Sequence, residues 1–556
     1  MSPASTRFLA ALAPIAFPAV TAMRTPPTPT ALWRVSVEAA VQVTVARTSV
    51  VINVTERRET LLAAAAGTAA IAGSYLVAGW TPSFVVRPID QTVVNLTPGP
   101  IVTATIETLG EAGHLLHIAL AFAIAVGLFG VVAFAGLRLA TRTDRRAVGA
   151  AVAGGGSWLL AAGLTGVSTG ALGAALPAAA VVGIGWLPSS AAPSGGDTEA
   201  VRDAPAVVDA VRRRTLGVVA GALGFVAATA VGRRVLASDD EPLPDAPRSE
   251  GAAARLRELD SASLAFESDD LQGMVTPIGE FYNVDIAEFD PEVTADEWSV
   301  TFTGETGSER TVDFDELIDR PAENRAVTLR CVGEDLNGRR IGNAVWTGTP
   351  IRPLLESVDP QGDCNCAMLR GEDGYYVQFP VDVLAEGFLA WGMNGRELPT
   401  SHGHPVRVLI PGHWGETNVK WLSEIELLNV EDDGYWEERG WEGTGEVTTV
   451  AKLWDEGITE LDDGRIELAG HAYAGTPGVE RVEVSTDGGD SWTDADLSEA
   501  LPDADVWRQW RHVFEPDGEH EVVVRAVDGE GTRQTSEASG PVPSGASGWV
   551  RRTVGE

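Results

Sequence analysis

Lysine is nearly absent from this chain of 556 residues, which contains two lysines, Lys420 and Lys452, against 39 arginines. Cysteine is also scarce, and three residues exclude a fold that depends on a framework of disulfides. Two of them, Cys364 and Cys366, form a CxC pair that could bind a metal, close a disulfide or do neither. No CxxCH sequence occurs, and three cysteines are too few for an iron–sulfur cluster. Any haem or iron–sulfur carrier must therefore be a separate protein.

The two halves of the chain differ in charge. Residues 1–236 contain 17 basic and 11 acidic residues, a net charge of +6, whereas residues 237–556 contain 24 and 67, a net of -43. Such an acidic surface repels itself in dilute buffer, and molar salt screens the repulsion because the Debye length falls to about 3 Å. We interpret it as that of an extreme halophile, the alternative being an acidic domain from an ordinary cell. Nucleic acid is excluded as a partner, because like charges repel.

Long apolar runs are confined to the first half of the chain. A helix needs about 20 apolar residues to cross roughly 30 Å of hydrocarbon. We expect residues 1–58 to form a cytoplasmic segment, with a signal-like or misassigned apolar stretch at 8–23, and residues 59–236 to form a transmembrane region of about five helices. The third and fourth spans are rich in Gly and Ala, which suits close packing of helices. The predicted spans are residues 61–79, 114–137, 147–167, 169–187 and 215–236.

The arginines orient these spans. Clusters of arginine precede the first span, follow the second and precede the fifth, while the loop of residues 80–112 carries only Arg87. By the positive-inside rule the clusters face the cytoplasm. Five crossings then place the chain after residue 237 outside, although Arg233 and Arg234 lie on the side that the rule disfavours. We predict a multi-pass protein of the cell membrane, in contact with membrane lipid, with its soluble half on the extracytoplasmic side.

The soluble half reads as two domains after a linker at residues 237–263. Residues 264–435 mix short strands with a few short helices, which indicates an α+β domain. Residues 446–556 contain strands at regular spacing with glycine turns, as in STDGGDSW (485–492). That spacing predicts an all-β immunoglobulin-like sandwich. The expected fold class is therefore multidomain, with an α-helical transmembrane anchor, an α+β domain and a C-terminal all-β sandwich.

Cys331 lies in TLRCVGEDLNGRRIGNAVWTG (328–348), where a predicted strand ends in a loop rich in Gly and Asn. A lone cysteine is most often a small buried hydrophobe. The same α+β domain also holds His402, Arg407 and Lys420. A chain with so little lysine keeps Lys420 between two apolar strands, as expected if a compact ammonium must meet an anion. Since a thiolate is a soft ligand for a transition metal, an anionic organic cofactor and one thiolate together suggest a pterin-bound molybdenum centre.

Short motifs across residues 272–430 are similar in order and spacing to those of the molybdopterin domain of the sulfite oxidase family. Residues 448–556 resemble the dimerisation domain that follows it in that family, through VEVSTDGGDSW and WRQWRHVFEPDGEHEVVVRAVDGEG. The N-terminal half resembles the multi-helix anchor of some prokaryotic members. The motifs of the first region are GEFYNVDI (279–286), TLRCVGE and IGNAVWTG (within 328–348), GYYVQFP (374–380), MNGRELP (393–399), HGHPVRVLIPG (402–412) and VKW (419–421).

The resemblance implies a molybdenum–molybdopterin cofactor and a role for ten residues. Two would be catalytic: Cys331 as the thiolate ligand of the metal, and Tyr375 as the active-site tyrosine, whose alternative is a strand tyrosine at the edge of the core. The others would bind the cofactor, some of them through backbone N–H groups at the phosphate end. These residues are Phe281, Tyr282, Asn283, His402, Arg407, Asn418, Val419 and Lys420.

The chain departs from sulfite-oxidising members at four positions where those proteins place arginines around a dianion. Each missing charge costs on the order of 1–3 kcal/mol of anion binding. Arg339 and Arg340 could substitute, but the direction of their loop is not fixed by the sequence. A neutral S-oxide or N-oxide therefore fits better than sulfite. At the four positions this chain has Asn283, Glu334 with Asp335, Val345 and Pro477.

These features predict a membrane-anchored molybdopterin oxidoreductase that transfers one oxygen atom and two electrons, with an S- or N-oxide or a related small molecule as substrate. The first alternative is a sulfite dehydrogenase or oxidase, and the second is a non-catalytic sensor or binding protein on the molybdopterin fold. A membrane-anchored scaffold protein is a further alternative, which leaves Cys331 and Lys420 unexplained. Electrons would pass through a separate copper or haem protein, or through a membrane quinone. The resemblance also implies a homodimer.

Overall fold

The computed structural model describes residues 56–555, apart from 100, 103–104, 106–113, 187–199, 237–248, 269, 287–288 and 504. The chain divides into two units, Met1–Leu61 and Leu62–Glu556. Of the first unit the structure describes only the beginning of an apolar helix. Most of the predicted cytoplasmic segment, including the signal-like stretch at 8–23, therefore lies outside the described residues.

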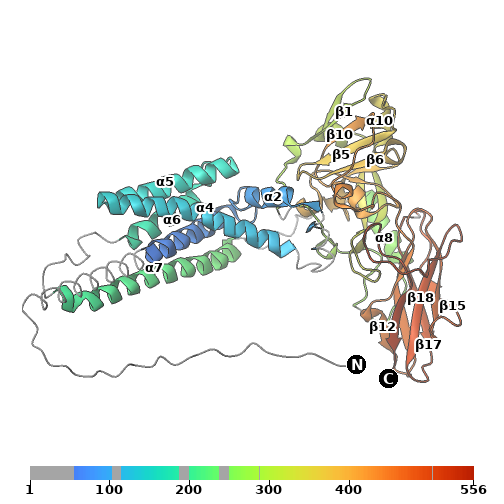
Figure 1. Ribbon diagram of the computed structural model, residues 1–556. Helices are drawn as coiled ribbons and strands as arrows, with labels where there is room; N and C mark the ends of the chain where they lie inside the picture. Colours follow the sequence, from blue (N-terminus) through green and yellow to red (C-terminus); the bar gives the residue numbers. More distant parts are fainter. Residues whose placement is uncertain are drawn as a thin grey trace, which may run out of the picture. The chain divides into compact units, whose positions relative to one another are not determined.

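Apolar helices make up the N-terminal part of the described chain (Figure 1). Four of them are long and apolar enough to cross a membrane: Glu56–Ala78, Leu115–Thr143, Arg146–Thr165 and Val211–Val231. They coincide with the first, second, third and fifth predicted spans, which supports anchoring in a membrane. The last three lie within α4 (His114–Thr143), α5 (Arg146–Thr165) and α7 (Ala200–Leu236).

The fourth predicted span, residues 169–187, is shorter than expected. It forms α6 (Leu172–Gly185), a helix of 14 residues with Pro177 inside it. At 1.5 Å per residue this helix rises about 21 Å, less than the roughly 30 Å of a hydrocarbon core. The described residues therefore contain four full-length apolar helices rather than five. The expected loop of residues 80–112 also contains a helix, α2 (Arg87–Leu96).

Glycine contacts between the helices confirm the close packing that the Gly/Ala-rich runs predict. A Cβ on Gly173 of α6 would lie 2.7 Å from the carbonyl oxygen of Gly73, and one on Gly149 of α5 would lie 2.7 Å from that of Gly136 in α4. Only glycine allows these backbones to touch. Large apolar side chains point outward from the same helices, as expected for a surface in lipid; they include Leu115, Leu120, Val131, Leu159, Leu176, Leu216 and Leu223.

The α+β region begins with helix α8 (Glu250–Ala262), which lies inside the predicted linker. Its N-cap is Ser249, whose hydroxyl oxygen accepts a hydrogen bond from the Ala252 amide. Ala252 and Leu259 belong to one hydrophobic cluster with Ala326 and Val345. The helix is therefore part of the folded α+β region, and the linker ends earlier than expected.

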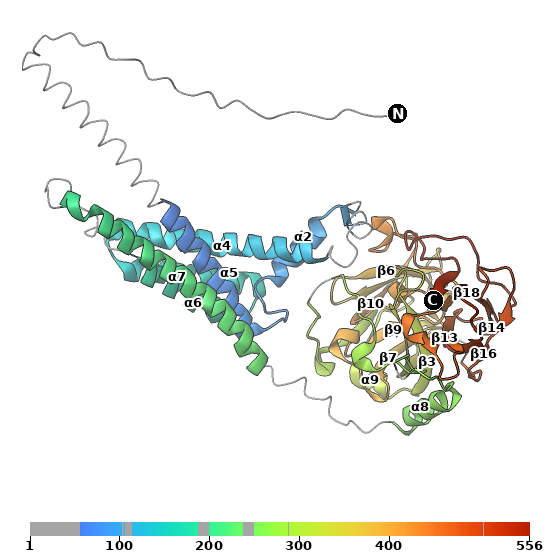
Figure 2. The same ribbon diagram turned by 90° about the horizontal axis from the view of Figure 1, so that it is seen from below.

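Two five-stranded sheets follow, and Figure 2 labels strands of both. In the first sheet, β1 and β10 are parallel and the other neighbours antiparallel. Its order is β2 (Arg310–Asp313), β1 (Ser299–Gly304), β10 (Leu422–Leu428), β5 (Cys366–Gly371) and β6 (Tyr376–Pro380). The second runs β3 (Glu323–Arg330), β4 (Ile341–Pro350), β7 (Phe388–Met393) and β8 (Arg396–Glu397), with β9 (Arg407–Leu409) beside β7.

Local sequence explains these elements. In β1 the buried residues Val300 and Phe302 alternate with more exposed ones, as a half-buried strand requires. The predicted NG turn closes the hairpin of β7 and β8, because Asn394 and Gly395 both have positive φ. Three short helices complete the region: α9 (Phe314–Ile318), α10 (Arg352–Ser357) and α11 (Val381–Leu384).

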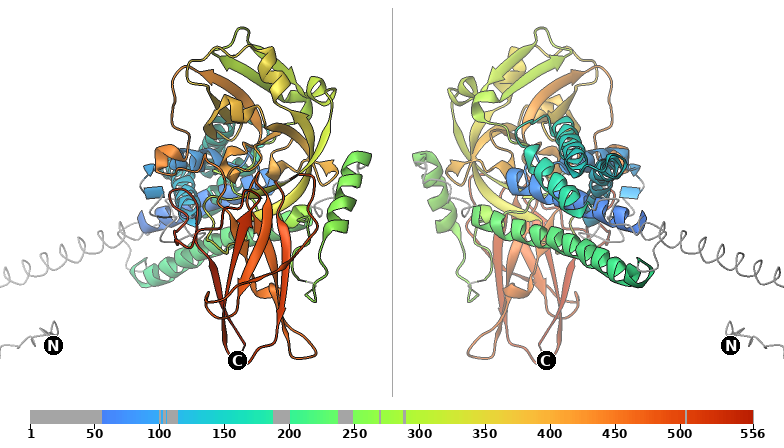
Figure 3. Two further views of the ribbon diagram at one scale, coloured as in Figure 1. Left: turned by 90° about the vertical axis from the view of Figure 1, so that its right-hand side faces the viewer. Right: turned by 90° about the vertical axis from the view of Figure 1, so that its left-hand side faces the viewer.

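The C-terminal region consists of two further sheets, whose strands run together in Figure 3 (orange to dark red). Both sheets contribute to one hydrophobic cluster, through Leu468 and Trp510 on one side and Val482 and Val524 on the other. The immunoglobulin-like connectivity stays a prediction. The first sheet contains β11 (Val450–Lys452), β12 (Ile458–Glu460), β13 (Ile466–Tyr473), β16 (Asp496–Leu497) and β17 (Arg508–Phe514); the second contains β14 (Val479–Ser485), β15 (Thr493–Asp494), β18 (His520–Asp528) and β19 (Val550–Val554).

Candidate active site

Cys331 follows the last residue of β3, as the sequence predicts. The loop of residues 331–340 returns the chain to β4, and the Cys331 amide donates to the Arg340 carbonyl at 2.9 Å, which closes the loop. Cys364 and Cys366 form a disulfide, so Cys331 is the free cysteine of this chain. The CxC pair therefore takes the disulfide alternative.

The Cys331 thiol is held in a tight, half-buried position. A Cβ on Gly333 would lie 3.5 Å from the ring of Trp441 and 3.8 Å from Sγ of Cys331, so this glycine leaves the sulfur beside the indole. Burial raises the pKa of the thiol to about 11, with Arg340 lowering it and Glu334 and Glu416 raising it. At neutral pH the free thiol is protonated, and a bound metal would ionise it.

Aromatic side chains form a wall beside this position. The ring of Phe281 stacks on Tyr282 with centroids 5.5 Å apart, and its edge meets Trp346 and His402 at 5.8 and 5.6 Å. A Cβ on Gly342 of β4 would lie 2.8 Å from the Phe281 ring, so the wall rests directly on the strand.

Tyr282 connects the thiol with the predicted cofactor residues. Its hydroxyl lies next to Gly415, where a Cβ would be 2.5 Å from the oxygen and 3.2 Å from the carbonyl oxygen of Arg330. Burial raises the pKa of Tyr282 well above its usual value, and the charges that act on it next most strongly are those of Cys331 and Arg407. The structure thus brings the metal-ligating candidate and the pterin-binding candidates into one site.

Arg407 is the buried cation of this site. Its Nη1 donates to the His402 carbonyl at 3.1 Å and its Nη2 to the Asn418 carbonyl at 3.0 Å, with the guanidinium over the ring of Trp346. Burial lowers the pKa of Arg407 to about 10. Burial, followed by the charges of Arg407 and Lys420, lowers the pKa of His402 to about 4, so its imidazole is neutral at pH 7.

Lys420 is the second cation, and it is engaged on three sides. Its ammonium forms an ion pair with Asp285 and donates to Asn283 Oδ1 at 2.6 Å and to the Ser401 carbonyl at 2.9 Å. Burial lowers the pKa of Lys420. Asn283, which the resemblance assigns to cofactor binding, accepts a hydrogen bond from Lys420 in the structure.

Asn418 and Val419 lie in the interior. The Asn418 side chain accepts from the Ile410 amide at 2.7 Å and donates to the Trp414 carbonyl at 3.1 Å. The Val419 side chain belongs to the main core of the α+β region. Both residues therefore fix the backbone between Arg407 and Lys420, and the predicted contacts through their N–H groups stay a prediction.

Tyr375 reaches the site indirectly. Its hydroxyl donates to the backbone carbonyl of Glu416 at 2.9 Å, in the turn that begins with Gly415 beside Arg330. Burial raises its pKa well above the usual value, and the nearby carboxylates Glu416 and Glu437 add to this. In the structure, the Tyr375 hydroxyl therefore contacts the turn of residues 415–417 and not Cys331 itself.

A pair of buried glutamates, Glu416 and Glu437, was missed by the sequence reading. All four of their carboxylate oxygens are buried, and none has a hydrogen-bond partner among the described residues. Burial, followed by the neighbouring Glu437 carboxylate, raises the pKa of Glu416 to about 8. The local sequence, HWGETNVKW (413–421), is mixed in polarity and gives no signal that Glu416 is buried.

Two family models match this part of the chain. Residues 287–436 match the oxidoreductase molybdopterin binding domain, and residues 446–542 match the Mo-co oxidoreductase dimerisation domain. Mitochondrial sulfite oxidase of Rattus norvegicus is 27% identical over 296 residues, which cover 43% of this chain and 53% of the rat protein. These matches support the resemblance of the soluble half to molybdopterin oxidoreductases of the sulfite oxidase type.

Two further relatives are similar at comparable identity but over different shares of their length. Sulfite oxidase of Arabidopsis thaliana is 24% identical over 320 residues, 46% of this chain and 80% of that protein. Nitrate reductase [NADH] of Volvox carteri is 28% identical over 254 residues, 35% of this chain and 29% of that protein. This chain spans about half the length of the rat protein. The solved structure of the sulfane dehydrogenase SoxCD from Paracoccus pantotrophus has a TM-score of 0.42 and 19% identity, covering 54% of this chain and 87% of that one.

The cofactor of the sulfite oxidase family, a molybdenum–molybdopterin group, fits the residues present. The Nε atom of Arg407 and the indole nitrogen of Trp421 are buried and have no hydrogen-bond partner among the described residues. Both are donors that a polar ligand could satisfy. No cluster of three or more His, Cys, Asp or Glu side chains that could hold a metal occurs in the described part of the chain. The metal would thus have Cys331 as its protein ligand, with the remaining sulfur ligands coming from the pterin.

Two cavities flank this family site without including the thiol. One of about 550 Å³ lies against residues 273–279, which lead into Phe281, and is also lined by Asn394 and Arg396. The other, of about 340 Å³, is lined by residues that include Thr400 and His404. Lys420, predicted to lie at the phosphate end, forms an ion pair with Asp285.

The raised pKa of Glu416 predicts a pH-dependent stability. A glutamate whose pKa rises from 4.5 in the unfolded chain to about 8 in the folded one favours folding at low pH, and this contribution is lost as the pH rises from about 4.5 to about 8. We expect Glu416→Gln to stabilise the protein increasingly over that range, measured by denaturant unfolding in molar salt. Glu442→Gln, an exposed residue on the nearby loop, should show no such trend. Equal pH profiles for wild type and Glu416→Gln would contradict the prediction.

Proposed function

We propose that this chain is a membrane-anchored molybdopterin oxidoreductase that transfers one oxygen atom and two electrons, with an S-oxide, an N-oxide or a related small molecule as substrate. The observation that carries the proposal is the position of Tyr282, which has the free thiol of Cys331 and the buried guanidinium of Arg407 as its electrostatic neighbours. One residue thus joins the metal end and the pterin end of a single site.

Each part of the site has a defined task in this proposal. Cys331 ligates the metal, Phe281 and Tyr282 pack against the pterin, and the cations Arg407 and Lys420 hold its anionic end. When bound, the molybdenum–pterin group supplies the two-electron couple and the exchange of one oxygen atom. Reduction of an oxide also consumes two protons, and the electrons come from a separate one-electron carrier.

The carboxyl pair supports the direction of oxide reduction. Glu416 keeps a proton near neutral pH, because its pKa is raised to about 8. Its backbone carbonyl accepts a hydrogen bond from the Tyr375 hydroxyl. A protonated carboxyl beside the active-site tyrosine suits a reaction that takes up protons.

The charges around the thiol support a neutral substrate. Of the four positions where the resemblance expects arginine, Val345 is buried in the core and Asn283 binds Lys420. Glu334 is buried in an ion pair with Arg330. A dianion would therefore meet few cations beside the thiol.

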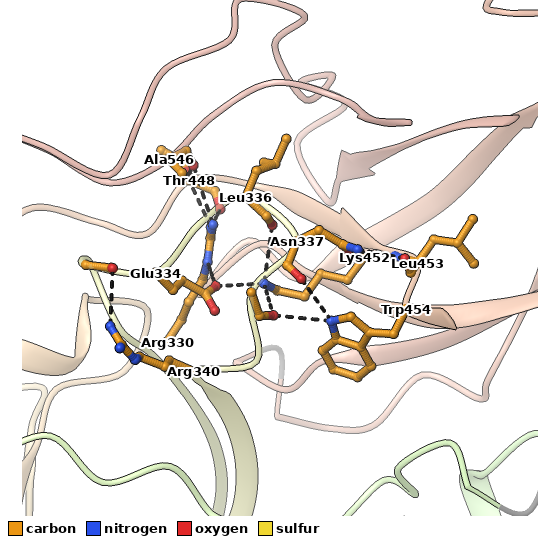
Figure 4. Close-up of polar contacts among 12 residues, drawn as sticks. Arg330, Glu334, Leu336, Asn337, Arg340, Thr448, Lys452, Leu453, Trp454 and Ala546 are labelled. Atoms are coloured by element: carbon orange, nitrogen blue, oxygen red, sulfur yellow. Dashed lines mark hydrogen bonds and ion pairs between the residues drawn. The ribbon is translucent and has the colours of Figure 1, made fainter. Parts of the chain in front are cut away.

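Sulfite oxidation is the second candidate, and one observation favours it. Arg340 acts on Cys331 as a nearby positive charge, and its Nη1 donates to the Gly333 carbonyl at 3.4 Å (Figure 4). Arg339, the other arginine of the loop, instead pairs with Glu456 on the C-terminal region. One cation at the thiol is a minimal sulfite site. A non-catalytic sensor is the weaker alternative, because Cys331, Arg407 and Lys420 are all in place.

The location and partners form part of the proposal. We place the soluble half on the extracytoplasmic side, which the arginine clusters favour and which suits the Cys364–Cys366 disulfide, since disulfides persist in oxidising compartments. This arrangement requires α6 to complete a crossing, because four crossings return the chain to its starting side. The dimerisation domain supports a homodimer, and a copper or haem protein or a membrane quinone carries the electrons.

Cys331→Ser tests the metal ligand. We expect turnover to fall below detection and the molybdenum content of the purified full chain to drop, because serine offers no soft thiolate. The double variant Cys364→Ser/Cys366→Ser is the matched control and should keep metal and turnover. Full activity of Cys331→Ser would remove the central assignment.

A substrate panel tests the reaction. With molybdenum-loaded protein in molar salt, we expect kcat/KM for at least one S- or N-oxide, with a reduced dye as electron donor, to exceed that for sulfite with an oxidised dye by roughly tenfold or more, as one missing charge contact of 1–3 kcal/mol implies. Faster turnover of sulfite would favour the second candidate. Metal without turnover of either kind would indicate a sensor, and absence of metal a scaffold.

Cysteine labelling tests the membrane side. Asp462→Cys, in an exposed turn of the C-terminal region, should react with a membrane-impermeant maleimide in intact cells, whereas Asp144→Cys, between α4 and α5, should react only after lysis. The parent chain measures the background from Cys331. Labelling of both positions only after lysis would show that the soluble half is cytoplasmic.

A further inference from the structure

The chain's other lysine, Lys452, is buried against the loop that carries Cys331. It is the last residue of β11 in the C-terminal region, and its side chain is 1% exposed. Its ammonium donates to Glu334 Oε1 at 2.7 Å, to the Gly338 carbonyl at 3.0 Å and to the Leu336 carbonyl at 3.3 Å (Figure 4). All three acceptors belong to the loop of residues 331–340, so one side chain from another domain satisfies three groups of that loop.

Neighbours of Lys452 hold the same loop. Asn337 exchanges two hydrogen bonds with the backbone of Leu453, at 2.7 and 3.0 Å. The indole nitrogen of Trp454 donates to the carbonyls of Asn337 and Gly338, at 3.2 Å each. Figure 4 shows these contacts arriving from one side of the loop. Residues 452–454 therefore hold this loop in addition to its contacts with its own strands.

The contact between Lys452 and Glu334 is part of a buried charge cluster. Arg330, the residue before Cys331, donates through Nε to Glu334 Oε1 at 2.7 Å and through Nη1 to the Thr448 carbonyl at 2.8 Å. The side chains of Arg330, Glu334 and Lys452 are at most 1% exposed. Burial lowers the pKa of Lys452 to about 8, which shows how completely this ammonium is removed from water.

The charges of this cluster do not cancel. Two cations face one carboxylate, and Oε2 of that carboxylate, on Glu334, has no hydrogen-bond partner among the described residues. The nearby Asp335 is exposed, so water screens it. A buried excess of positive charge is costly unless an anion lies close. Glu334 is one of the charges that act on Cys331, so the two cations that pair with this carboxylate affect the thiol through it.

We propose that Lys452 is a positioning residue for the metal-ligating thiol: it fixes the Cys331 loop from the dimerisation domain and, by pairing with Glu334, offsets a negative charge that acts on the thiol. The inference rests on the proposed function, in which Cys331 ligates molybdenum. Lys452 touches neither substrate nor cofactor and acts through Glu334 and the loop backbone.

The first test uses the metal-free full chain, in which Cys331 is the one cysteine outside the disulfide. We expect Lys452→Met to increase the rate of alkylation of Cys331 about tenfold or more, because breaking a buried ion pair frees the loop to open. Arg339→Gln is the matched control: it removes an exposed ion pair between the same loop and Glu456, and should leave the rate unchanged. An unchanged rate in Lys452→Met would overturn the positioning role.

The second test uses molybdenum-loaded protein at pH 6.5, where Lys452 is charged. Loss of a nearby cation disfavours the addition of electrons, so Lys452→Met should lower the midpoint potential of the metal, measured by potentiometric titration followed by electron paramagnetic resonance. Glu334→Gln removes a negative charge and should raise it, while Lys452→Arg should restore the wild-type value. Loosening of the loop alone would move the potential of Lys452→Met and Glu334→Gln in one direction, which would overturn the charge role.

These arms remain decisive if one variant does not fold. Cooperative thermal unfolding in molar salt identifies such a variant. If Lys452→Met does not fold, a raised midpoint potential in Glu334→Gln beside an unchanged one in Lys452→Arg still supports the charge role, and a lowered potential in Glu334→Gln overturns it. A wild-type chain that binds no molybdenum would overturn the proposed function and this inference together. A wild-type chain with molybdenum and variants with unchanged potentials would overturn the inference alone.

Discussion

The ion pair between Lys452 and Glu334 joins the domain that carries the thiol to the domain that follows it. The loop after β3 leaves the carbonyls of residues 336–338 without partners on its own strands, and the segment of residues 452–454 provides the donors. A loop of ten residues held only at its ends would be mobile, and binding the metal would then cost the conformational entropy of ordering it. The position of Cys331 is therefore a property of two domains folded together.

The same physics accounts for the presence of lysine. Lys420 and Lys452 each have three acceptors around the ammonium, from Asp285, Asn283 and Ser401 in one case and from the loop of residues 331–340 in the other. An ammonium has three donors in a compact arrangement, whereas a guanidinium is a planar fork with five. The two lysines lie where three acceptors converge on one point, whereas the buried arginines Arg330 and Arg407 spread their donors over separate acceptors.

Much of the local structure could be predicted from the sequence. The end of a strand before Cys331, the glycine turn in residues 485–492 and the motif order around Cys331 were all predicted from the sequence. These features depend on a few neighbouring residues, so a window of sequence contains the necessary information. The fourth membrane span failed for a related reason: hydropathy counts apolar residues but does not show where the helix ends, and α6 has 14 residues.

The parts that escaped prediction are contacts between distant segments. Glu416 and Glu437 lie 21 positions apart, on different loops, and each is an ordinary glutamate by its own neighbours. Their burial follows from the fold, since the loop that contains Gly443 passes directly over the Glu416 carboxylate. Lys452 is a similar case: its scarcity drew attention to it, but its partner Glu334 lies in another domain, 118 positions away.

The site is polarised, and this polarity links cofactor binding to the choice of substrate. Cations gather at the end where Arg407 and Lys420 lie, and carboxyl groups gather near Tyr375 and Cys331. In the proposed function, the anionic end of the cofactor would lie at the first end, where Lys420 is already paired with Asp285 and Arg407 is the buried cation. The carboxyl groups at the other end would then face the substrate. A neutral oxide that is reduced there would gain from the proton on Glu416, so oxide reduction should be fastest below a pH of about 8, where Glu416 holds that proton.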